Sequence, residues 1–264
     1  MRTNRVKRAL REGKPSVGTW LSLGNVTAAR FMARTGFDWL NVDIEHSMVG
    51  METSAAIFGA VADAGCTILA RVPSNRHENI KRVLDNGAHG IVVPMVNTRT
   101  EAEAAVSAVL YPPYGTRSVG GGAHALNFDA TPSEYYAKAN DELLIVLQCE
   151  HIESVRNADA IFSVPGIDAI FVGPNDLAAS MRSKDGKPPA AEATKEAMQH
   201  ILATCKKHKV AAGVHAFSAK EARMYIDEGW QFIAINSELK FMLDTATSVL
   251  KDLGMGTRGE GAKY

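Results

Sequence analysis

The stretch CTILARVPSNRHENIKRVLDNGAHGIVVPMV (66–96) contains the structural unit from which the whole chain is built. An apolar, β-branched run at 66–72 leads into a helical pattern at 77–87 that ends in a glycine, and a second apolar run follows at 90–96. Continuous apolar runs of this length are typical of strands covered on both faces, as in a parallel sheet. A glycine after the last periodic residue is a common helix stop. The stretch therefore predicts a strand, a helix and a second, parallel strand.

The same unit recurs along all 264 residues. The apolar runs predicted as strands are 16–22, 39–46, 66–72, 90–96, 143–150, 168–174, 210–216 and 232–238. The helical patterns between them are 27–36, 52–65, 77–87, 101–110, 194–208 and 219–229. Strands that alternate with helices form right-handed βαβ units, and eight such units close a barrel of about 250 residues.

The predicted fold is therefore an α/β parallel (β/α)8 TIM barrel, a single domain over 1–264. An open, doubly wound sheet is the alternative, but no GxGxxG phosphate fingerprint follows the first strand. Two segments depart from the rhythm. Residues 111–142 form a long loop with a short helix near 133–140. Within it, GGGAHALNF (120–128) is a candidate specificity lid, or else a segment that simply packs on the surface. The tail at 254–264 lacks a periodic apolar face and is expected to be mobile.

Charge and composition exclude several classes of protein. The 29 basic and 29 acidic residues cancel, which argues against nucleic acid as a partner. The three cysteines are widely spaced and fit a reducing compartment better than a disulfide framework. The basic N-terminus has no apolar segment after it, and no apolar run is long enough to span a membrane. We expect a cytoplasmic protein without a membrane partner.

Ionisable and amide side chains gather where the predicted strands end, which is where a TIM barrel carries its active site. They are Asp43, Glu45, His46, Arg71, Gln148, Glu150, Asp176, His215, Asn236 and Glu238. Glu150 and Asp176 follow neighbouring strands, and two converging carboxylates need a positive charge between them. A hard divalent cation such as Mg²⁺ or Mn²⁺ would supply it and keep positions open for water and substrate. The simpler alternative is that Asp176 caps a helix and Glu150 pairs with a surface cation.

Two further groups could handle protons and charge. A carboxylate at Asp43 could orient the imidazole of His46 and make it a base near neutral pH. The alternative is that His46 bonds a loop carbonyl and Asp43 a backbone N–H. The guanidinium of Arg71 could neutralise an oxyanion or bind a carboxylate, or it could simply bridge to a neighbouring carboxylate. None of the predicted strands contains a lysine, so carbanion chemistry here would use a metal ion rather than an imine.

At these residues the chain resembles a known family. The segments GTWLSLGN, GFDWLNVDIEHS, ILARVPSN, LDNGAHGIVVPMV, YPPYGTRSVGG, LQCE and FVGPNDLAAS are similar to the HpcH/HpaI class II aldolases. That family includes 4-hydroxy-2-oxoheptanedioate aldolase, 2-keto-3-deoxy sugar-acid aldolases and macrophomate synthase. The likeness covers about residues 5–250, and DxEHS, YPPxGxR and VGPND in this order are its specific part.

The resemblance implies a lyase that cleaves 4-hydroxy-2-oxo acids reversibly to pyruvate and an aldehyde, through an enolate stabilised by Mg²⁺, Mn²⁺ or Co²⁺. It also implies a homohexamer, a trimer of dimers with a swapped C-terminal helix. The roles that it implies are metal ligands at Glu150 and Asp176, an enolate-stabilising group at Arg71, a base at His46 supported by Asp43, and pyruvate contacts at Gln148, Gly173, Pro174 and Asn175. Asp85 matches an acidic residue that reaches a neighbouring subunit's site.

Other functions stay open at this point. An oxaloacetate decarboxylase or macrophomate synthase-like enzyme would use the same enolate, a CoA-ester lyase would use a related barrel, and a non-catalytic protein could bind the same oxo acids. The strand ends GVHAFS, with His215, and INSE depart from the family pattern, as does Asn175. The aldehyde therefore does not follow from any relative.

Overall fold

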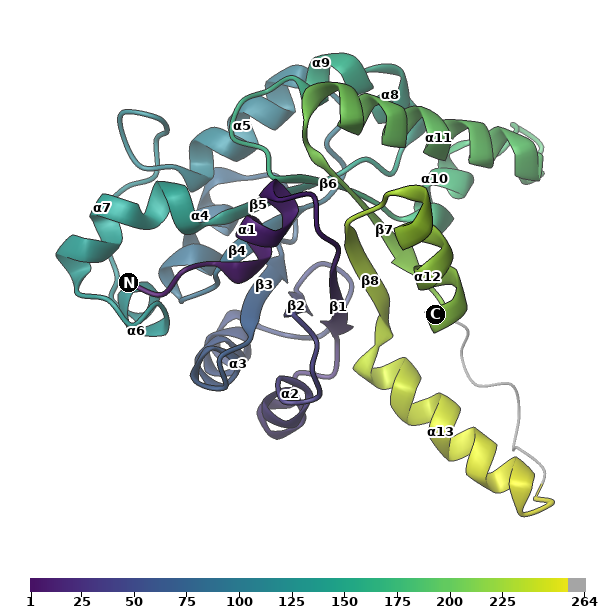
Figure 1. Ribbon diagram of the computed structural model, residues 1–264, viewed down its shortest axis with the longest axis horizontal. Helices are drawn as coiled ribbons and strands as arrows, with labels where there is room; N and C mark the ends of the chain where they lie inside the picture. The colour runs from purple at the N-terminus through teal and green to yellow at the C-terminus, as the bar shows by residue number, and fades with distance from the viewer. Residues whose placement is uncertain (256–264) are drawn as a thin grey trace.

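Eight parallel strands form a closed barrel in the computed structural model, which describes residues 1–255 (Figure 1). The strands are β1 (Ser16–Leu21), β2 (Trp39–Asp43), β3 (Thr67–Arg71), β4 (Gly90–Val93), β5 (Leu144–Gln148), β6 (Ala169–Val172), β7 (Ala211–Ala216) and β8 (Phe232–Ser237). Each strand pairs with the next in the chain, and β8 pairs with β1 to close the ring. The predicted (β/α)8 TIM barrel is confirmed, with a strand inside each predicted run.

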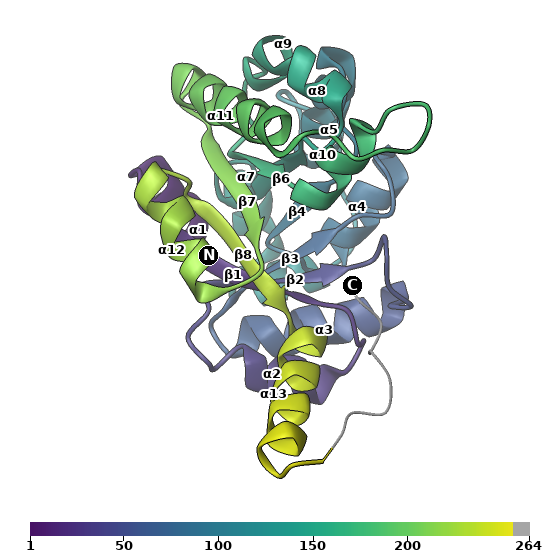
Figure 2. The ribbon, with the colours of Figure 1, turned by 90° about the vertical axis from the view of Figure 1, so that its right-hand side faces the viewer.

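Helices connect the strands and cover the outside of the barrel (Figures 1 and 2). They are α1 (Arg5–Arg11), α2 (Val26–Met32), α3 (Met51–Asp63), α4 (His77–Asp85), α5 (Arg99–Val109), α6 (Ala123–Asn127), α7 (Pro132–Glu142), α8 (Ile152–Arg156), α9 (Ala158–Phe162), α10 (Pro174–Ser180), α11 (Ala191–His208), α12 (Ala219–Glu228) and α13 (Glu238–Asp252). All six predicted helices are present. The sequence did not indicate α1, α6, α8 and α9, whose five to seven residues are too few for a periodic apolar pattern.

Apolar side chains form two separate cores because successive residues of a strand point to opposite faces. One core fills the barrel. The end of the barrel at which the strands begin is called its lower end here, and α1 closes it with Val6 and Leu10. The other core lies between the barrel and the surrounding helices. Inside the barrel, the rings of Trp39 and Phe232 stack with centroids 4.2 Å apart. Gly18 leaves room for them, since a Cβ at that position would lie 2.1 Å from the Trp39 ring.

A buried ion pair attaches α1 to the lower end of the barrel. The Nζ atom of Lys7 lies 2.9 Å from Oδ2 of Asp168, and both side chains are almost fully buried. Lys7 also donates to the Leu143 carbonyl oxygen, while Asp168 accepts from the Ile145 N–H. Burial raises the pKa of Asp168, and the Lys7 ammonium opposes that rise. Each charge therefore depends on the other for its stability inside the protein.

Replacing Lys7 with Met should lower the free energy of unfolding by about 3 kcal/mol, because a buried charge then loses its principal partner. Urea denaturation followed by circular dichroism measures this loss. Arg8→Met on the same helix is the matched control: its pair with Glu142 is exposed and should be worth less than about 1 kcal/mol. Equal stability of the two variants would contradict this account of α1.

The long segment at 111–142 lies at the lower end of the barrel, because it connects the end of α5 to the beginning of β5. It contains α6 and α7 and is fixed by buried contacts of Arg117, which donates hydrogen bonds to Asp85 over 2.7 Å and to the Tyr135 hydroxyl over 3.1 Å. The strand C-termini lie at the opposite end. The candidate lid at 120–128 therefore does not lie over the site of its own chain.

The last helix, α13, projects away from the barrel (Figures 1 and 2). Glu238 is its one buried residue, while Met242, Leu243, Val249 and Leu250 are exposed. The single chain leaves this apolar surface uncovered, so the predicted helix exchange stays a prediction. The expected mobility of the tail concerns mainly residues 256–264, which lie outside the described residues. Within residues 1–255, no helix combines the length and the apolar character needed to cross a membrane.

Candidate active site

The inward-facing side chains at the C-terminal ends of the strands form one polar layer above the barrel core. Trp20, Asp43, Arg71, Gln148 and His215 belong to it, and they come from β1, β2, β3, β5 and β7. Asp43 pairs in register with Arg71 on the neighbouring strand. The alternation of strand residues thus brings together side chains that are far apart in the sequence.

The guanidinium of Arg71 is held on three sides. Asp43 accepts two hydrogen bonds from it, over 3.0 Å from Nε and 2.7 Å from Nη2, and Oε2 of Glu45 lies 3.2 Å from Nε. The indole of Trp20 covers one face, with Cζ of Arg71 4.6 Å from the ring centroid. Arg71 does bridge to a neighbouring carboxylate, but its Nη1 has no hydrogen-bond partner within residues 1–255. That nitrogen is available to an incoming oxyanion.

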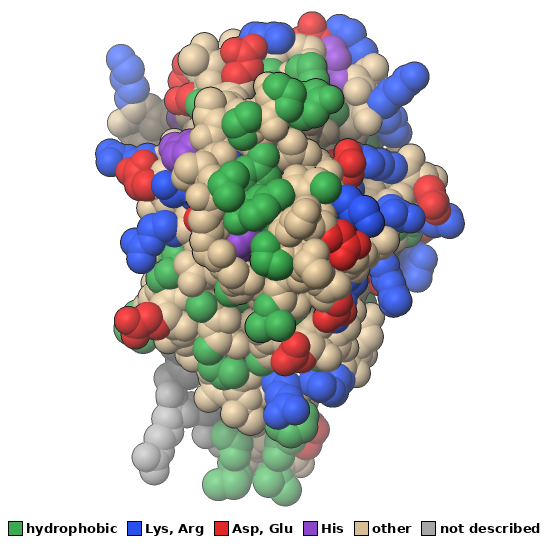
Figure 3. Space-filling model, turned by 90° about the vertical axis from the view of Figure 1, so that its left-hand side faces the viewer, with side chains coloured by type: hydrophobic (Ala, Val, Ile, Leu, Met, Phe, Trp, Pro, Cys, Tyr) green, Lys and Arg blue, Asp and Glu red, His purple; other side chains and the backbone are tan. Residues whose placement is uncertain are grey.

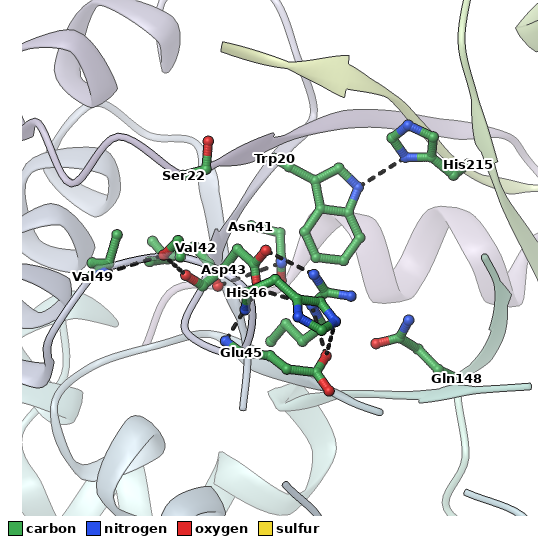
Figure 4. Close-up of polar contacts among 12 residues, drawn as sticks. Trp20, Ser22, Asn41, Val42, Asp43, Glu45, His46, Val49, Gln148 and His215 are labelled. Atoms are coloured by element: carbon green, nitrogen blue, oxygen red, sulfur yellow. Dashed lines mark hydrogen bonds and ion pairs between the residues drawn. The ribbon is translucent and has the colours of Figure 1, made fainter. Parts of the chain in front are cut away.

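Asp43 does not support the imidazole of His46 as predicted. Its Oδ1 accepts from the backbone N–H groups of Glu45 and His46, over 3.1 and 3.2 Å, so it fixes the loop after β2 (Figure 4). The carboxylate beside the imidazole is Glu45, with Oε2 3.6 Å from Nε2 of His46. The physical reason is that both oxygens of Asp43 already accept hydrogen bonds from Arg71. The His46 side chain is 65% exposed and reaches solvent above the layer.

Glu150 follows β5 and is buried beneath the rim of the site. Its Oε1 accepts from the Met95 N–H over 2.9 Å, and its Oε2 accepts from the Gln148 amide over 2.5 Å. Met95 has a left-handed backbone, with φ of 54°. Burial raises the pKa of Glu150 to about 7; the Met95 hydrogen bond opposes this, and the nearby Asp176 carboxylate adds to it. A cation bound beside Glu150 would stabilise its charged form and offset this rise in pKa.

Asp176 approaches Glu150 across a glycine. It lies in the first turn of α10, and Gly173, not Asp176, is the N-cap residue, so the simple capping role does not apply. A Cβ at Gly173 would lie 3.0 Å from Oδ2 of Asp176 and 3.3 Å from Oε2 of Glu150. The two carboxylate oxygens are thus no further apart than the sum of those distances. A side chain at 173 would fill the space that both oxygens face.

These observations test whether a divalent cation suits the site. Three carboxylates (Asp43, Glu45 and Glu150) act on the single guanidinium of Arg71, and Asp176 adds a fourth negative charge beside Glu45 and Glu150. Burial raises the pKa of Glu45 as well. Oε1 of Gln148 is buried without a hydrogen-bond partner. Within residues 1–255 no group of three or more His, Cys, Asp or Glu side chains could hold a metal. The Glu150–Asp176 pair fits an ion such as Mg²⁺, which takes one or two carboxylates and fills its other positions with water and substrate.

The remaining predicted residues lie in two places. Gly173, Pro174 and Asn175 form the beginning of α10 beside the carboxylate pair. Asp85 is at the C-terminal end of α4, where the helix has returned to the lower end of the barrel and pairs with Arg117. The chain does not bring Asp85 to its own site, so its predicted role would require a second subunit.

Sequence reasoning missed two residues of the layer. The sequence pattern places Glu45 at a strand end and assigns it no role, although it contacts both Arg71 and His46. The pattern assigns none to Trp20 either, although Trp20 occupies an inward position two residues after Gly18. Both signals were in the sequence: one is strand alternation, and the other is the position of Glu45 in the loop that carries the predicted base.

Comparisons with known proteins agree with this geometry. Residues 16–245 match the family described as HpcH/HpaI aldolase/citrate lyase. A 5-keto-4-deoxy-D-glucarate aldolase from Escherichia coli O139:H28 (strain E24377A / ETEC) is 35% identical, over 94% of this chain and 96% of that protein. The crystal structure of an HpcH/HpaI aldolase/citrate lyase family protein from Burkholderia cenocepacia J2315 is 32% identical, with a TM-score of 0.87, over 96% of this chain and all of that one. An HpcH/HpaI aldolase from Desulfitobacterium hafniense DCB-2 is 26% identical, with a TM-score of 0.85, over 97% and 98% of the two chains.

Proposed function

The chain belongs to the HpcH/HpaI aldolase/citrate lyase family, and on that premise we propose that it is a divalent-metal-dependent class II pyruvate aldolase. It is an enzyme, a carbon–carbon lyase of the aldolase type. The proposed substrates are 4-hydroxy-2-oxo acids, cleaved reversibly to pyruvate and an aldehyde. The observation that carries the proposal is the pair Glu150 and Asp176, which face one side-chain-free space at Gly173 beside Arg71.

Glu150 and Asp176 would hold the metal ion, and Gln148 would fix the Glu150 carboxylate in place. A bound divalent ion supplies Lewis-acid polarisation of the 2-oxo group, which lowers the cost of forming an enolate. The beginning of α10 would receive the substrate carboxylate, because the first N–H groups of a helix lack partners within the helix.

The protein's own groups would then perform the cleavage. His46 would take the proton of the 4-hydroxyl group, the C3–C4 bond would break, and its electron pair would pass to the 2-oxo oxygen as the aldehyde leaves. Nη1 of Arg71 would donate to that oxygen as its negative charge develops. The anchoring of Arg71 by Asp43 and Glu45 means that little reorganisation is needed in the reaction.

The proposal is tested by incubating the enzyme with pyruvate and a panel of aldehydes in Mg²⁺, Mn²⁺ or Co²⁺, before and after chelation. We expect aldol products in at least one metal and their loss on chelation. Oxaloacetate decarboxylation without any aldol product would favour the decarboxylase alternative. Turnover of CoA esters alone would favour a CoA-ester lyase, and no turnover at all would favour an oxo-acid-binding protein.

Replacing His46 with Ala should slow aldol cleavage by about 100-fold, within the usual contribution of a general base. Proton exchange at C3 of pyruvate should fall much less, because the 4-hydroxyl proton is absent from that step. The rate of product formation measures aldol cleavage. The rate at which the pyruvate methyl signal disappears in deuterium oxide measures proton exchange. His77→Ala, at the exposed beginning of α4, is the matched control. Equal losses in both reactions would contradict the assignment of His46.

The assembly proposed is a homohexamer, a trimer of dimers in which α13 packs on a neighbouring chain. The apolar side chains of α13 are exposed in one chain, as are Tyr114, Val119 and Leu126. Figure 3 shows the side of the molecule opposite to that in Figure 2. Apolar side chains gather near the middle of this face, and more lie at the bottom of the view. A surface of this kind usually marks a contact with another protein.

Replacing Leu243 and Leu250 together with Glu should dissociate the proposed hexamer, because charges would enter an apolar contact. Light scattering after size-exclusion chromatography measures the number of chains in each species. Ser248→Glu together with Thr247→Glu adds the same two charges to α13 without removing its exposed leucines and is the control. A wild-type monomer, or a double variant of unchanged size, would contradict the proposal.

We also place the protein in the cytoplasm, supported by Cys66, Cys149 and Cys205, which are all buried free thiols.

A further inference from the structure

We propose that His215 is a positioning residue: it accepts the indole N–H of Trp20 and so fixes the ring on which the Arg71 guanidinium rests. The inference deepens the proposed aldolase function and rests on it for its kinetic part. His215 is one of the residues at which the chain departs from the family pattern. The device would therefore be a property of this protein rather than of the barrel in general.

The hydrogen bond fixes the tautomer of His215. Nε1 of Trp20 lies 3.1 Å from Nδ1 of His215 (Figure 4). An indole nitrogen can only donate, so Nδ1 must carry the lone pair and a neutral ring must carry its proton on Nε2. Burial, together with the nearby Arg71 charge, lowers the pKa of His215 to about 4, which agrees with a neutral ring. Within residues 1–255, Nε2 has no hydrogen-bond partner, so the Nδ1 bond is the ring's fixed contact.

Trp20 transmits this restraint to Arg71. The indole is 8% exposed and packs against Phe171, with ring centroids 5.7 Å apart, and against the guanidinium at 4.6 Å. Asp43 and Glu45 hold the edge of the guanidinium, while the indole covers its face. A cation over an indole face is attracted by the ring's quadrupole, provided that the ring keeps its orientation. The Nδ1 bond is the polar contact that sets this orientation.

Loss of the bond should affect the rate of reaction more than substrate binding. Without His215 the indole N–H would be buried and unpaired, and the ring would rotate to find water. The guanidinium would then lose its support and its alignment with the developing oxyanion. Binding of pyruvate depends mainly on the proposed metal and on α10. We therefore expect kcat to fall while KM for the 2-oxo acid changes little.

A double-mutant cycle between His215→Leu and Trp20→Phe tests whether His215 acts through Trp20. Each single variant should lower kcat by about 10-fold, the scale expected when a buried donor or acceptor loses its partner. The double variant should be no slower than the slower single variant, since both changes break the same bond. Phe217→Leu alters the neighbouring ring, 4.9 Å from His215, without touching the bond, and should stay within about twofold of wild type. If the fold-loss of kcat in the double variant equals the product of the two single losses, the inference is overturned.

His215→Asn distinguishes the two ring nitrogens. An Asn side-chain oxygen can take the place of Nδ1 and accept the indole N–H, but it offers nothing at the position of Nε2. We expect Asn to recover most of the kcat that Leu loses. An Asn variant as slow as the Leu variant would overturn the inference, because it would point to donation from Nε2 instead.

A spectroscopic measurement separates this inference from the proposed function. The difference in near-UV circular dichroism between wild type and Trp20→Phe gives the signal of the Trp20 indole. His215→Leu should alter that signal and His215→Asn should largely restore it, whatever reaction the enzyme catalyses. An unchanged Trp20 signal in His215→Leu would overturn the inference even if aldolase activity is found. An inactive wild-type enzyme with the expected spectra would instead reject the proposed function.

Discussion

Glu150→Gln and Asp176→Asn should each lower kcat/KM for aldol cleavage by about 1,000-fold or more, because each removes one of two proposed metal ligands. Both changes keep the side-chain shape and remove only the charge. Steady-state kinetics over a range of Mg²⁺ and Mn²⁺ concentrations measures the effect. Added metal should restore little activity, since the defect lies in the ligand rather than in the supply of ions.

The control for this prediction is Glu153→Gln, at the beginning of α8 and three residues beyond Glu150. Glu153 is exposed, so the same chemical change there should leave activity within about twofold of wild type. Thermal denaturation should show that all three variants are folded. Full activity of either ligand variant in metal-free buffer would reject the metal role of the carboxylate pair.

Arg71→Lys should lower kcat by about 100-fold, comparable to the loss of one oxyanion donor in other enzymes. Lysine keeps the positive charge but cannot form the two-bond contact with Asp43, and it cannot present a planar face to Trp20. The charge would then move relative to the reacting oxygen. Steady-state kinetics with wild type and variant measures the change in kcat and in KM separately.

Arg76→Lys is the matched control, because Arg76 follows the same strand and its side chain is 73% exposed. It should leave both kinetic constants unchanged within error. An Arg71→Lys enzyme with more than a third of wild-type kcat would contradict the role given to the guanidinium. A variant that fails to fold would be recognised by circular dichroism, and Arg71→Gln would then supply the kinetic comparison.

The barrel and the location of its polar layer were predictable from sequence, because apolar runs and glycine stops report the order of strands and helices. The same order also shows why the candidate lid at 120–128 does not lie over the site of its own chain. A segment that follows a helix and precedes a strand, as 111–142 does, lies at the lower end of a barrel. The Gly- and Pro-rich composition of 111–142 favours a functional loop, but the end of the barrel at which the loop lies follows from its place in the chain.

Side-chain partners beyond a strand end were harder to predict. Asp43 is the last residue of β2 and faces Arg71 because the two residues pair in register. His46 is three residues into a loop, and its ring direction depends on the turn that Asp43 itself stabilises. Sequence spacing alone could not show that Asp43 holds the backbone of His46 while Glu45 approaches the ring. The contacts of Trp20 and His215 also join distant segments, so only the closed barrel reveals them.

Direct binding of Mn²⁺ to the wild-type protein and to Glu150→Gln and Asp176→Asn tests the central claim most directly. Electron paramagnetic resonance or calorimetry should give one site per chain in the wild type and a large loss of affinity in both variants. Because the pKa of Glu150 is raised to about 7, the proton competes with the metal, and affinity should fall as the pH is lowered below 7. Unchanged Mn²⁺ affinity in both variants, or no binding to the wild type above pH 7, would contradict the account.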